Sequence, residues 1–70
     1  MKENNGKETI LNIYIGLRSS LARAVMGLVP PREVEDIVQE TYVRVCQIKR
    51  PQDIRQPRSY LFRTARNLAL

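Results

Sequence analysis

Apolar residues recur at steps of three and four, the period of an α-helix, in three separate parts of this chain. The first predicted helix covers residues 8–27, the second covers residues 31–49, and the third begins at Pro57. No segment alternates between apolar and polar positions as a strand does, and no repeat is present. The pattern therefore predicts an all-α fold, a compact three-helix domain. The apolar positions expected to build its core in the first and third helices are Ile10, Tyr14, Leu17, Leu21, Ala24, Val25, Leu28, Leu61, Phe62, Ala65, Leu68 and Ala69.

Glycine and proline mark the expected boundaries between these helices. Gly27 is a plausible stop for the first helix, and Pro31 suits the first position of the second, where a missing N–H is not needed. Residues 50–57 contain two prolines and no helical period, which predicts a proline-bounded loop between helices two and three. Residues 1–7 are polar and predict a flexible leader ahead of a helical domain at residues 8–70.

The second predicted helix has two chemically different faces. At 100° per residue, its core side consists of Val34, Ile37, Val38, Thr41, Tyr42, Val45 and Ile48. Its other side consists of Glu33, Asp36, Gln39, Glu40, Val43, Arg44 and Gln47. Glu40 and Arg44 are spaced for an ion pair worth about 0.2–0.5 kcal/mol. Carboxylates on an exposed helix lack the pocket and the shifted pKa values that catalysis needs, so the second side is either a solvated face or a surface that binds a partner protein.

The net charge of +5 lies almost entirely in the C-terminal part of the chain. Residues 1–43 hold five basic and six acidic side chains, a net of −1, whereas residues 44–70 hold seven basic side chains and one acidic, a net of +6. Such a concentration favours a polyanion, most simply nucleic acid, because neutralised phosphates release counterions. The alternative is a solvated basic surface.

Composition argues against several classes of protein. The chain has no histidine and a single cysteine, so it has neither a zinc ligand set nor an internal disulfide, and no cofactor is expected. Cys46 is expected to be a small half-buried hydrophobe rather than a nucleophile. No apolar run is long enough to span a bilayer, and the N-terminus lacks the apolar stretch of a signal peptide, so we expect a cytoplasmic protein without direct membrane insertion. A 70-residue chain that must also build a core is not expected to be an enzyme.

Two segments together resemble a known family. Residues 35–45, EDIVQETYVRV, followed after a loop by residues 57–69, PRSYLFRTARNLA, closely resemble region 2 of bacterial sigma-70-family factors of the extracytoplasmic-function (ECF) group. Residues 54–61, IRQPRSYL, further resemble the iron-uptake, FecI-like branch. The resemblance covers roughly residues 10–70. It implies a sigma-factor domain that binds RNA polymerase and DNA in transcription initiation.

The resemblance assigns the acidic surface to a protein partner. In the family, a D-x-x-Q-E surface on the second helix docks on the clamp helices of the polymerase β′ subunit, and the matching positions here are Asp36, Gln39 and Glu40. Arg44, one turn further on, would extend this surface. Carboxylates suit the task because they accept paired hydrogen bonds from arginine.

The resemblance assigns the basic end to promoter DNA. Family members melt the −10 element and capture a flipped base of the non-template strand in the loop before the third helix, here about residues 49–57. Tyr60 and Phe62 are expected to belong to the core or its edge rather than to stack on bases. The residues expected to contact DNA are Lys49, Arg50, Arg55, Arg58, Arg63, Arg66 and Asn67.

The match is incomplete, and other functions stay open. After Ala69 the family's helix continues into an arginine cluster, and a second helical domain reads the −35 element, so we expect this chain to be a C-terminally truncated fragment of a longer protein. A helix-turn-helix module that binds duplex DNA is one alternative, although the loop is long for its usual turn. Another is a protein-interaction domain held by an anti-sigma factor, which in the iron-uptake branch is often membrane-anchored.

Overall fold

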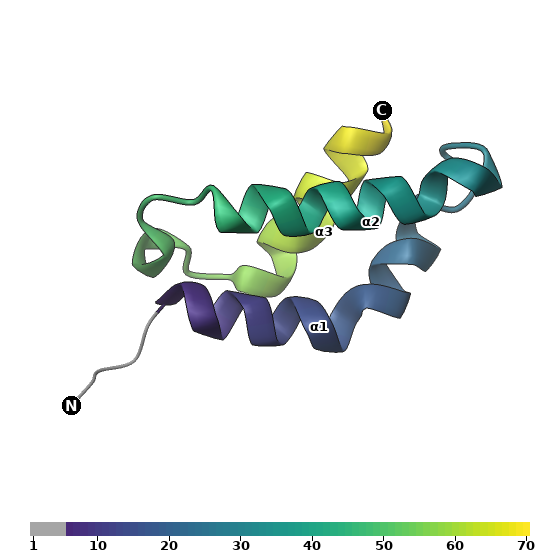
Figure 1. Cartoon of the computed structure of the whole chain (residues 1–70). Coiled ribbons are helices and arrows are strands. Elements are labelled where there is room, and N and C mark those ends of the chain that lie inside the picture. The colour runs from purple at the N-terminus through teal and green to yellow at the C-terminus, as the bar shows by residue number, and fades with distance from the viewer. Residues whose placement is uncertain (1–5) are drawn as a thin grey trace.

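The computed structural model describes residues 6–70, and these form three α-helices that pack on one another (Figure 1). The helices are α1 (Gly6–Val25), α2 (Pro31–Cys46) and α3 (Pro57–Ala69), with a short 3-10 helix, η1 (Pro51–Asp53), between α2 and α3. α1 and α2 run antiparallel, and α3 crosses them (Figure 1). No β-strand occurs within residues 6–70, so the predicted all-α, three-helix fold is confirmed. None of these helices is long and apolar enough to cross a membrane.

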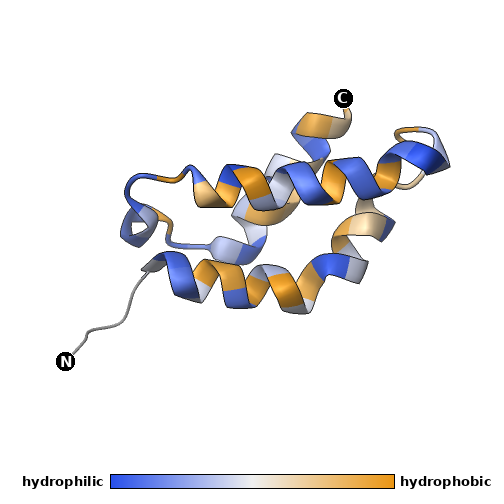
Figure 2. Cartoon of the chain, in the orientation of Figure 1, coloured by the Kyte–Doolittle hydropathy of each residue, from blue (hydrophilic) through white to orange (hydrophobic). Residues whose placement is uncertain are grey.

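The apolar stripes of the three helices meet in one core. Figure 2 shows these stripes in orange, alternating with polar positions along each helix. The largest fully buried side chains come from all three helices: Ile10, Leu21, Val25, Thr41, Val45 and Leu61. Thr41 is the one polar member of this group, and its hydroxyl donates a 2.9 Å hydrogen bond to the backbone oxygen of Ile37. A buried hydroxyl is thereby satisfied within its own helix.

α1 begins two residues before the predicted start and ends two residues before the predicted stop. Met26 already bonds back to the carbonyl oxygens of Ala22 and Arg23, and Gly27 adopts a positive φ of 88°, which glycine tolerates best. Because the chain turns here, Leu28 lies outside the helix and is exposed rather than part of the core. The predicted leader falls mostly on residues 1–5, which lie outside the described residues, whereas Gly6 and Lys7 belong to α1.

α2 begins at Pro31 as predicted but ends at Cys46, three residues before the expected end. The N–H of Gln47 is shared between the carbonyl oxygens of Val43 and Arg44, which tightens the last turn. Pro51 then follows, and the residue before a proline is pushed out of the helical region; Arg50 has φ −129° and ψ 72°. The Nζ of Lys7 donates a 2.9 Å hydrogen bond to the carbonyl oxygen of Cys46 and so satisfies one backbone acceptor at this helix end.

Two α2 residues are more exposed than their sequence positions suggested. Tyr42 was expected in the core and is 46% exposed, although its ring lies against that of Tyr14, with 5.6 Å between centroids. Cys46 was expected to be half-buried and is exposed. The two residues are one turn apart on the edge of the apolar stripe, where α1 covers only part of the surface. They mark the limit of the α1–α2 contact.

The predicted loop between α2 and α3 contains more order than its two prolines indicated. Residues 51–53 form η1, closed by bonds from the N–H groups of Asp53 and Ile54 to the carbonyl oxygens of Arg50 and Pro51. Pro57 opens α3 as predicted. The core face of α3 is formed by Leu61, Ala65 and Ala69, with Leu68 half-buried beside them.

Candidate protein and DNA interfaces

The residues predicted to bind polymerase form one exposed surface on α2. Asp36, Gln39, Glu40 and Arg44 are all exposed, and we call them the α2 outer surface. They lie there because Val38, Thr41 and Val45 turn the opposite side of the helix into the core. Arg44 Nε lies 3.5 Å from Glu40 Oε2, so the predicted pair forms, with both side chains about half exposed. An exposed pair of this kind contributes little to stability, so these side chains are available to a partner.

The seven residues predicted to bind DNA are also exposed, but they do not form one cluster. Lys49, Arg50 and Arg55 lie in the segment between α2 and α3, and Arg58, Arg63, Arg66 and Asn67 lie on α3. At 100° per residue, Arg63 and Arg66 share the outer side of α3 with Asn67 near them, whereas Arg58 in the first turn lies on a different side.

A hollow of about 560 Å³ lies where the loop enters α3, and we call it the loop hollow. It brings together Arg55 of the loop and Arg63 of α3, two of the predicted DNA contacts. Lys49, Arg50, Arg58, Arg66 and Asn67 do not line it. Its full lining is Asp53, Ile54, Arg55, Gln56, Ser59, Tyr60 and Arg63. The hollow thus combines apolar, aromatic, amide, acidic and guanidinium groups, a mixture suited to holding a nucleobase next to its phosphate.

Tyr60 has two roles in this structure. Tyr60 and Phe62 are both half-buried and pack against the core, as predicted. Tyr60 also lines the loop hollow, so one part of its side chain contacts the core while another borders the hollow. An anchored tyrosine loses little entropy when a ligand arrives, which favours its use at a binding site.

Sequence reasoning missed the polar residues that order the loop. Asp53 Oδ2 lies 2.8 Å from Arg50 Nε, so the one acidic residue of the basic region pairs with a predicted DNA contact. Ser59 donates a 3.4 Å hydrogen bond to Gln56 Oε1 at the start of α3. The three-residue spacing of Arg50 and Asp53 was the available signal, but it predicts a contact only if the segment turns, and two prolines concealed the 3-10 turn.

The first turn of α1 supports the loop from behind. A Cβ atom placed on Gly6 would lie 3.1 Å from the backbone nitrogen of Gln52 and 3.3 Å from the carbonyl carbon of Pro51. The missing side chain of Gly6 therefore permits α1 to approach η1 closely. Together with the Lys7 bond to Cys46, this contact ties both ends of the α2–η1 connection to α1.

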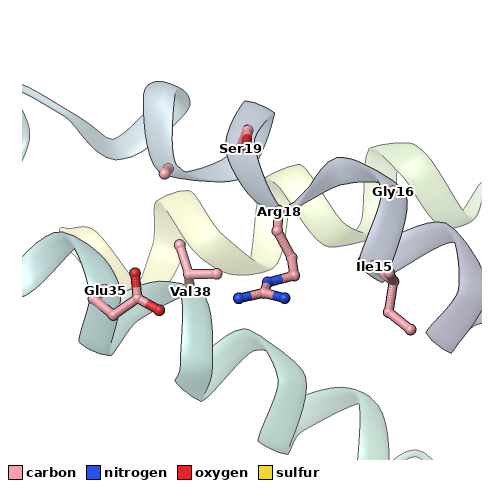
Figure 3. A pocket seen from close by; sticks show the side chains of 7 residues that line it. Ile15, Gly16, Arg18, Ser19, Glu35 and Val38 are labelled. Carbon is pink, nitrogen blue, oxygen red and sulfur yellow. The ribbon is translucent and has the colours of Figure 1, made fainter.

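A second hollow, of about 290 Å³, lies between α1 and α2 on another side of the molecule (Figure 3). Arg18 reaches from α1 into the space beside Val38 and Glu35 of α2 (Figure 3). Burial raises the pKa of the nearby Tyr14 phenol, the charge of Arg18 opposes this rise, and Glu35 adds to it. The pKa of Tyr42 is raised chiefly by a hydrogen bond with the Cys46 side chain. Both phenols therefore keep their protons at neutral pH.

These surfaces carry both hydrogen-bond acceptors and hydrogen-bond donors. Within residues 6–70 no cluster of three or more cysteine, aspartate or glutamate side chains is placed to hold a metal ion. The α2 outer surface offers acceptors for a basic protein partner, and the loop and α3 offer donors for phosphates and bases. These two groups of residues lie on different elements of one core.

Comparison with known proteins agrees with this arrangement. Residues 12–70 match the family model described as sigma-70 region 2, which covers nearly all of the chain. A search of the curated proteins and a search of the solved structures each return no match. Because the family match spans α2, the loop and α3, it includes every residue of the two candidate interfaces. The chain belongs to the sigma-70 region 2 family, a non-enzymatic class of domains that acts with RNA polymerase in transcription initiation.

Proposed function

We propose that this domain binds core RNA polymerase through the α2 outer surface and holds the melted −10 strand of a promoter with the loop and α3. The observation that carries the proposal is the loop hollow, which joins Arg55 and Arg63 at the point where the loop enters α3. Its volume of about 560 Å³ lies within the usual range for small-molecule sites, so it has room for a single base.

The α2 outer surface supports the proposed binding of polymerase. Asp36, Gln39 and Glu40 are exposed, and within residues 6–70 no hydrogen bond or ion pair engages the side chains of Asp36 or Gln39. An arginine-bearing helix, such as the β′ clamp helices, would find carboxylate acceptors there and an amide that both donates and accepts. Arg44 is partly engaged by Glu40 and would extend the contact at its edge.

The proposed binding of melted DNA depends on a balance of free energies. A flipped base gains a binding site that the paired base lacks, and this gain offsets a few kcal/mol of unstacking. Arg63 and Arg66 on the outer side of α3 would then follow the backbone of the same strand, with Asn67 near a base edge. Lys49 and Arg58 would contribute phosphate contacts from the ends of the loop.

A helix-turn-helix module is disfavoured by the observed connection. Ten residues, 47–56, separate α2 from α3 and include η1, whereas a helix-turn-helix unit uses a turn of about 3–4 residues. Duplex binding is therefore an outcome of the test and not the expectation.

The residues of the loop support a finer assignment within the family. Residues 54–61, IRQPRSYL, favour the extracytoplasmic-function group and its iron-uptake, FecI-like branch. Such a domain would act in the cytoplasm and would be held inactive by a membrane-anchored anti-sigma factor that covers one or both of the candidate interfaces.

Two binding measurements test the proposal. In gel shifts, we expect single-stranded −10 DNA of the non-template sense to bind more tightly than the same sequence as a duplex. In a pull-down, we expect core RNA polymerase to retain the domain. Preferential binding of duplex would favour the helix-turn-helix alternative. Failure of core polymerase to retain a domain that binds DNA in the gel shift would contradict the assignment of the α2 outer surface.

A further inference from the structure

α1 carries a second apolar stripe, which lies outside the core. Ile15 and Met26 are each 62% exposed, the highest value for a large hydrophobic side chain within residues 6–70 apart from Leu70. Met26 extends the stripe because its N–H still bonds to the carbonyl oxygen of Ala22, at 3.1 Å. At 100° per residue, Ile15, Ala22 and Met26 fall within about 40° of one another and about 120° from the core side of α1. Exposed apolar area of this kind favours contact with another surface.

A hollow between α1 and α2 lies beside each end of this stripe. Ile15 and Ala22 line the hollow of about 290 Å³ shown in Figure 3. Met26 lines a further hollow, of about 440 Å³, beside the turn that joins the two helices. Glu35 of α2 lines both hollows, so they are adjoining parts of one surface. We call Ile15, Arg18, Ala22, Met26 and Glu35 the α1–α2 surface.

The α1–α2 surface presents one positive and one negative side chain, and neither has an ion-pair partner. Arg18 and Glu35 are exposed and extend into the same hollow from the two helices (Figure 3). Within residues 6–70 no hydrogen bond or ion pair engages either side chain. A partner of uniform charge would attract one of them and repel the other, whereas a partner that carries both charges can satisfy both. The α1–α2 surface itself carries both charges.

A second copy of this chain meets these requirements. In a two-fold interface, residue i of one copy meets residue j of the other, and j meets i. If two copies of α1 lie antiparallel, Ile15 of each copy faces Met26 of the other, because the two residues share one side of the helix about 16 Å apart along its axis. Arg18 and Glu35 lie between the two ends of the stripe, so the same rotation brings the carboxylate of each copy near the guanidinium of the other.

We propose that two copies of this domain associate through the α1–α2 surface in an antiparallel, two-fold arrangement, with Ile15 against Met26 and Arg18 paired with Glu35 of the other copy. The inference goes beyond the proposed function and does not depend on it, because the α1–α2 surface shares no residue with the α2 outer surface or the loop hollow. The contact is confined to a short stretch of one helix and the hollows beside it, so we expect a weak dimer that depends on concentration.

Sedimentation equilibrium of the whole chain measures this association, with a reductant present because two exposed Cys46 thiols can form a disulfide between chains. We expect the average mass to rise from 8.1 kDa towards twice that value as the concentration rises from about 10 μM to about 1 mM. Arg18→Glu and Glu35→Arg each place like charges opposite one another, so each should weaken association about tenfold or more. In an equimolar mixture of the two variants every facing pair again has opposite charges, so association should return.

Glu33→Arg is the matched control for Glu35→Arg, because it makes the same change of charge at an exposed residue of α2 that lines neither hollow. It should associate as the wild type does. A wild-type mass of one chain over the whole concentration range would overturn the inference. Association that survives both charge reversals, or a mixture of the two variants that stays monomeric, would also overturn it. The experiment uses neither polymerase nor DNA, so the proposed function stands or falls separately.

Discussion

The phenol hydroxyl of Tyr14 on α1 donates a 3.1 Å hydrogen bond to the backbone carbonyl oxygen of Val38 on α2. This bond is buried, and it fixes α1 against the helix that carries the α2 outer surface. We expect Tyr14→Phe to lower the free energy of unfolding by about 0.5–1.5 kcal/mol, because it removes the hydrogen bond and keeps the ring. Urea denaturation followed by circular dichroism measures the change. Tyr60→Phe is the control and should change little, because the Tyr60 hydroxyl makes no hydrogen bond within residues 6–70.

The same phenol predicts a dependence of stability on alkaline pH. Burial raises the pKa of Tyr14 above its unfolded value of 10.0, with Arg18 opposing the rise and Glu35 and Tyr42 adding to it. The folded state therefore holds this proton to higher pH than the unfolded state does. Its contribution to stability is complete below about pH 10 and is lost as pH rises through the folded-state pKa. We expect the urea midpoint to fall less in Tyr14→Phe than in the wild type above that pH; equal losses in both would contradict the assignment.

Substitution by alanine is expected to affect stability differently at two glycines of α1. A Cβ on Gly16 would meet nothing within 4 Å, so Gly16→Ala should raise the free energy of unfolding by about 0.5–1 kcal/mol through helix propensity. A Cβ on Gly6 would lie 3.1 Å from the backbone of Gln52, and backbone does not yield easily. We expect Gly6→Ala to leave the free energy of unfolding unchanged or to lower it. Thermal unfolding of the two variants side by side makes the comparison, and a similar gain from both would show that α1 does not support the loop closely.

The sequence was sufficient to predict the helices but not the limits of their contacts. Pro31 and Pro57 open their helices as expected, because proline fits the first helical position and no tertiary contact opposes it. Tyr42 illustrates what periodicity misses. It falls on the apolar side of α2 by angle, yet the width of the buried stripe depends on how far α1 reaches across it, which is a property of the packed pair.

In the candidate interfaces, too, some features follow from the helical period and others depend on the folded structure. Exposure of Asp36 and Gln39 follows from the helical period alone. The loop hollow does not, because it depends on the 3-10 turn of η1 and on the pair of Arg50 with Asp53. Those features arise from contacts between residues whose positions only the folded loop defines, and so the sequence alone does not predict them.

The arginines on the outer side of α3 predict how the affinity for single-stranded DNA depends on salt. If Arg63 contacts the backbone of single-stranded DNA, Arg63→Ala should weaken binding and reduce the slope of log affinity against log salt by about 0.7. Arg66→Ala should act similarly. Arg32→Ala, in the first turn of α2 and away from the loop, removes the same charge and should leave the slope unchanged. Anisotropy titrations at several salt concentrations measure these slopes, and equal slopes for Arg63→Ala and Arg32→Ala would argue that α3 is merely solvated.

The most direct test of the whole account is the affinity of this domain for core RNA polymerase with and without the Asp36 carboxylate. A titration of labelled domain with core enzyme should show Asp36→Ala binding about tenfold or more weakly than the wild type, because an exposed carboxylate that pairs with an arginine of the partner is lost. The helical content and unfolding midpoint should stay unchanged, since Asp36 is exposed and lies outside the core. Glu35→Gln, on the α1 side of the same helix, should bind as the wild type does (Figure 3). Equal affinities for wild type and Asp36→Ala would contradict the claim that the α2 outer surface binds polymerase.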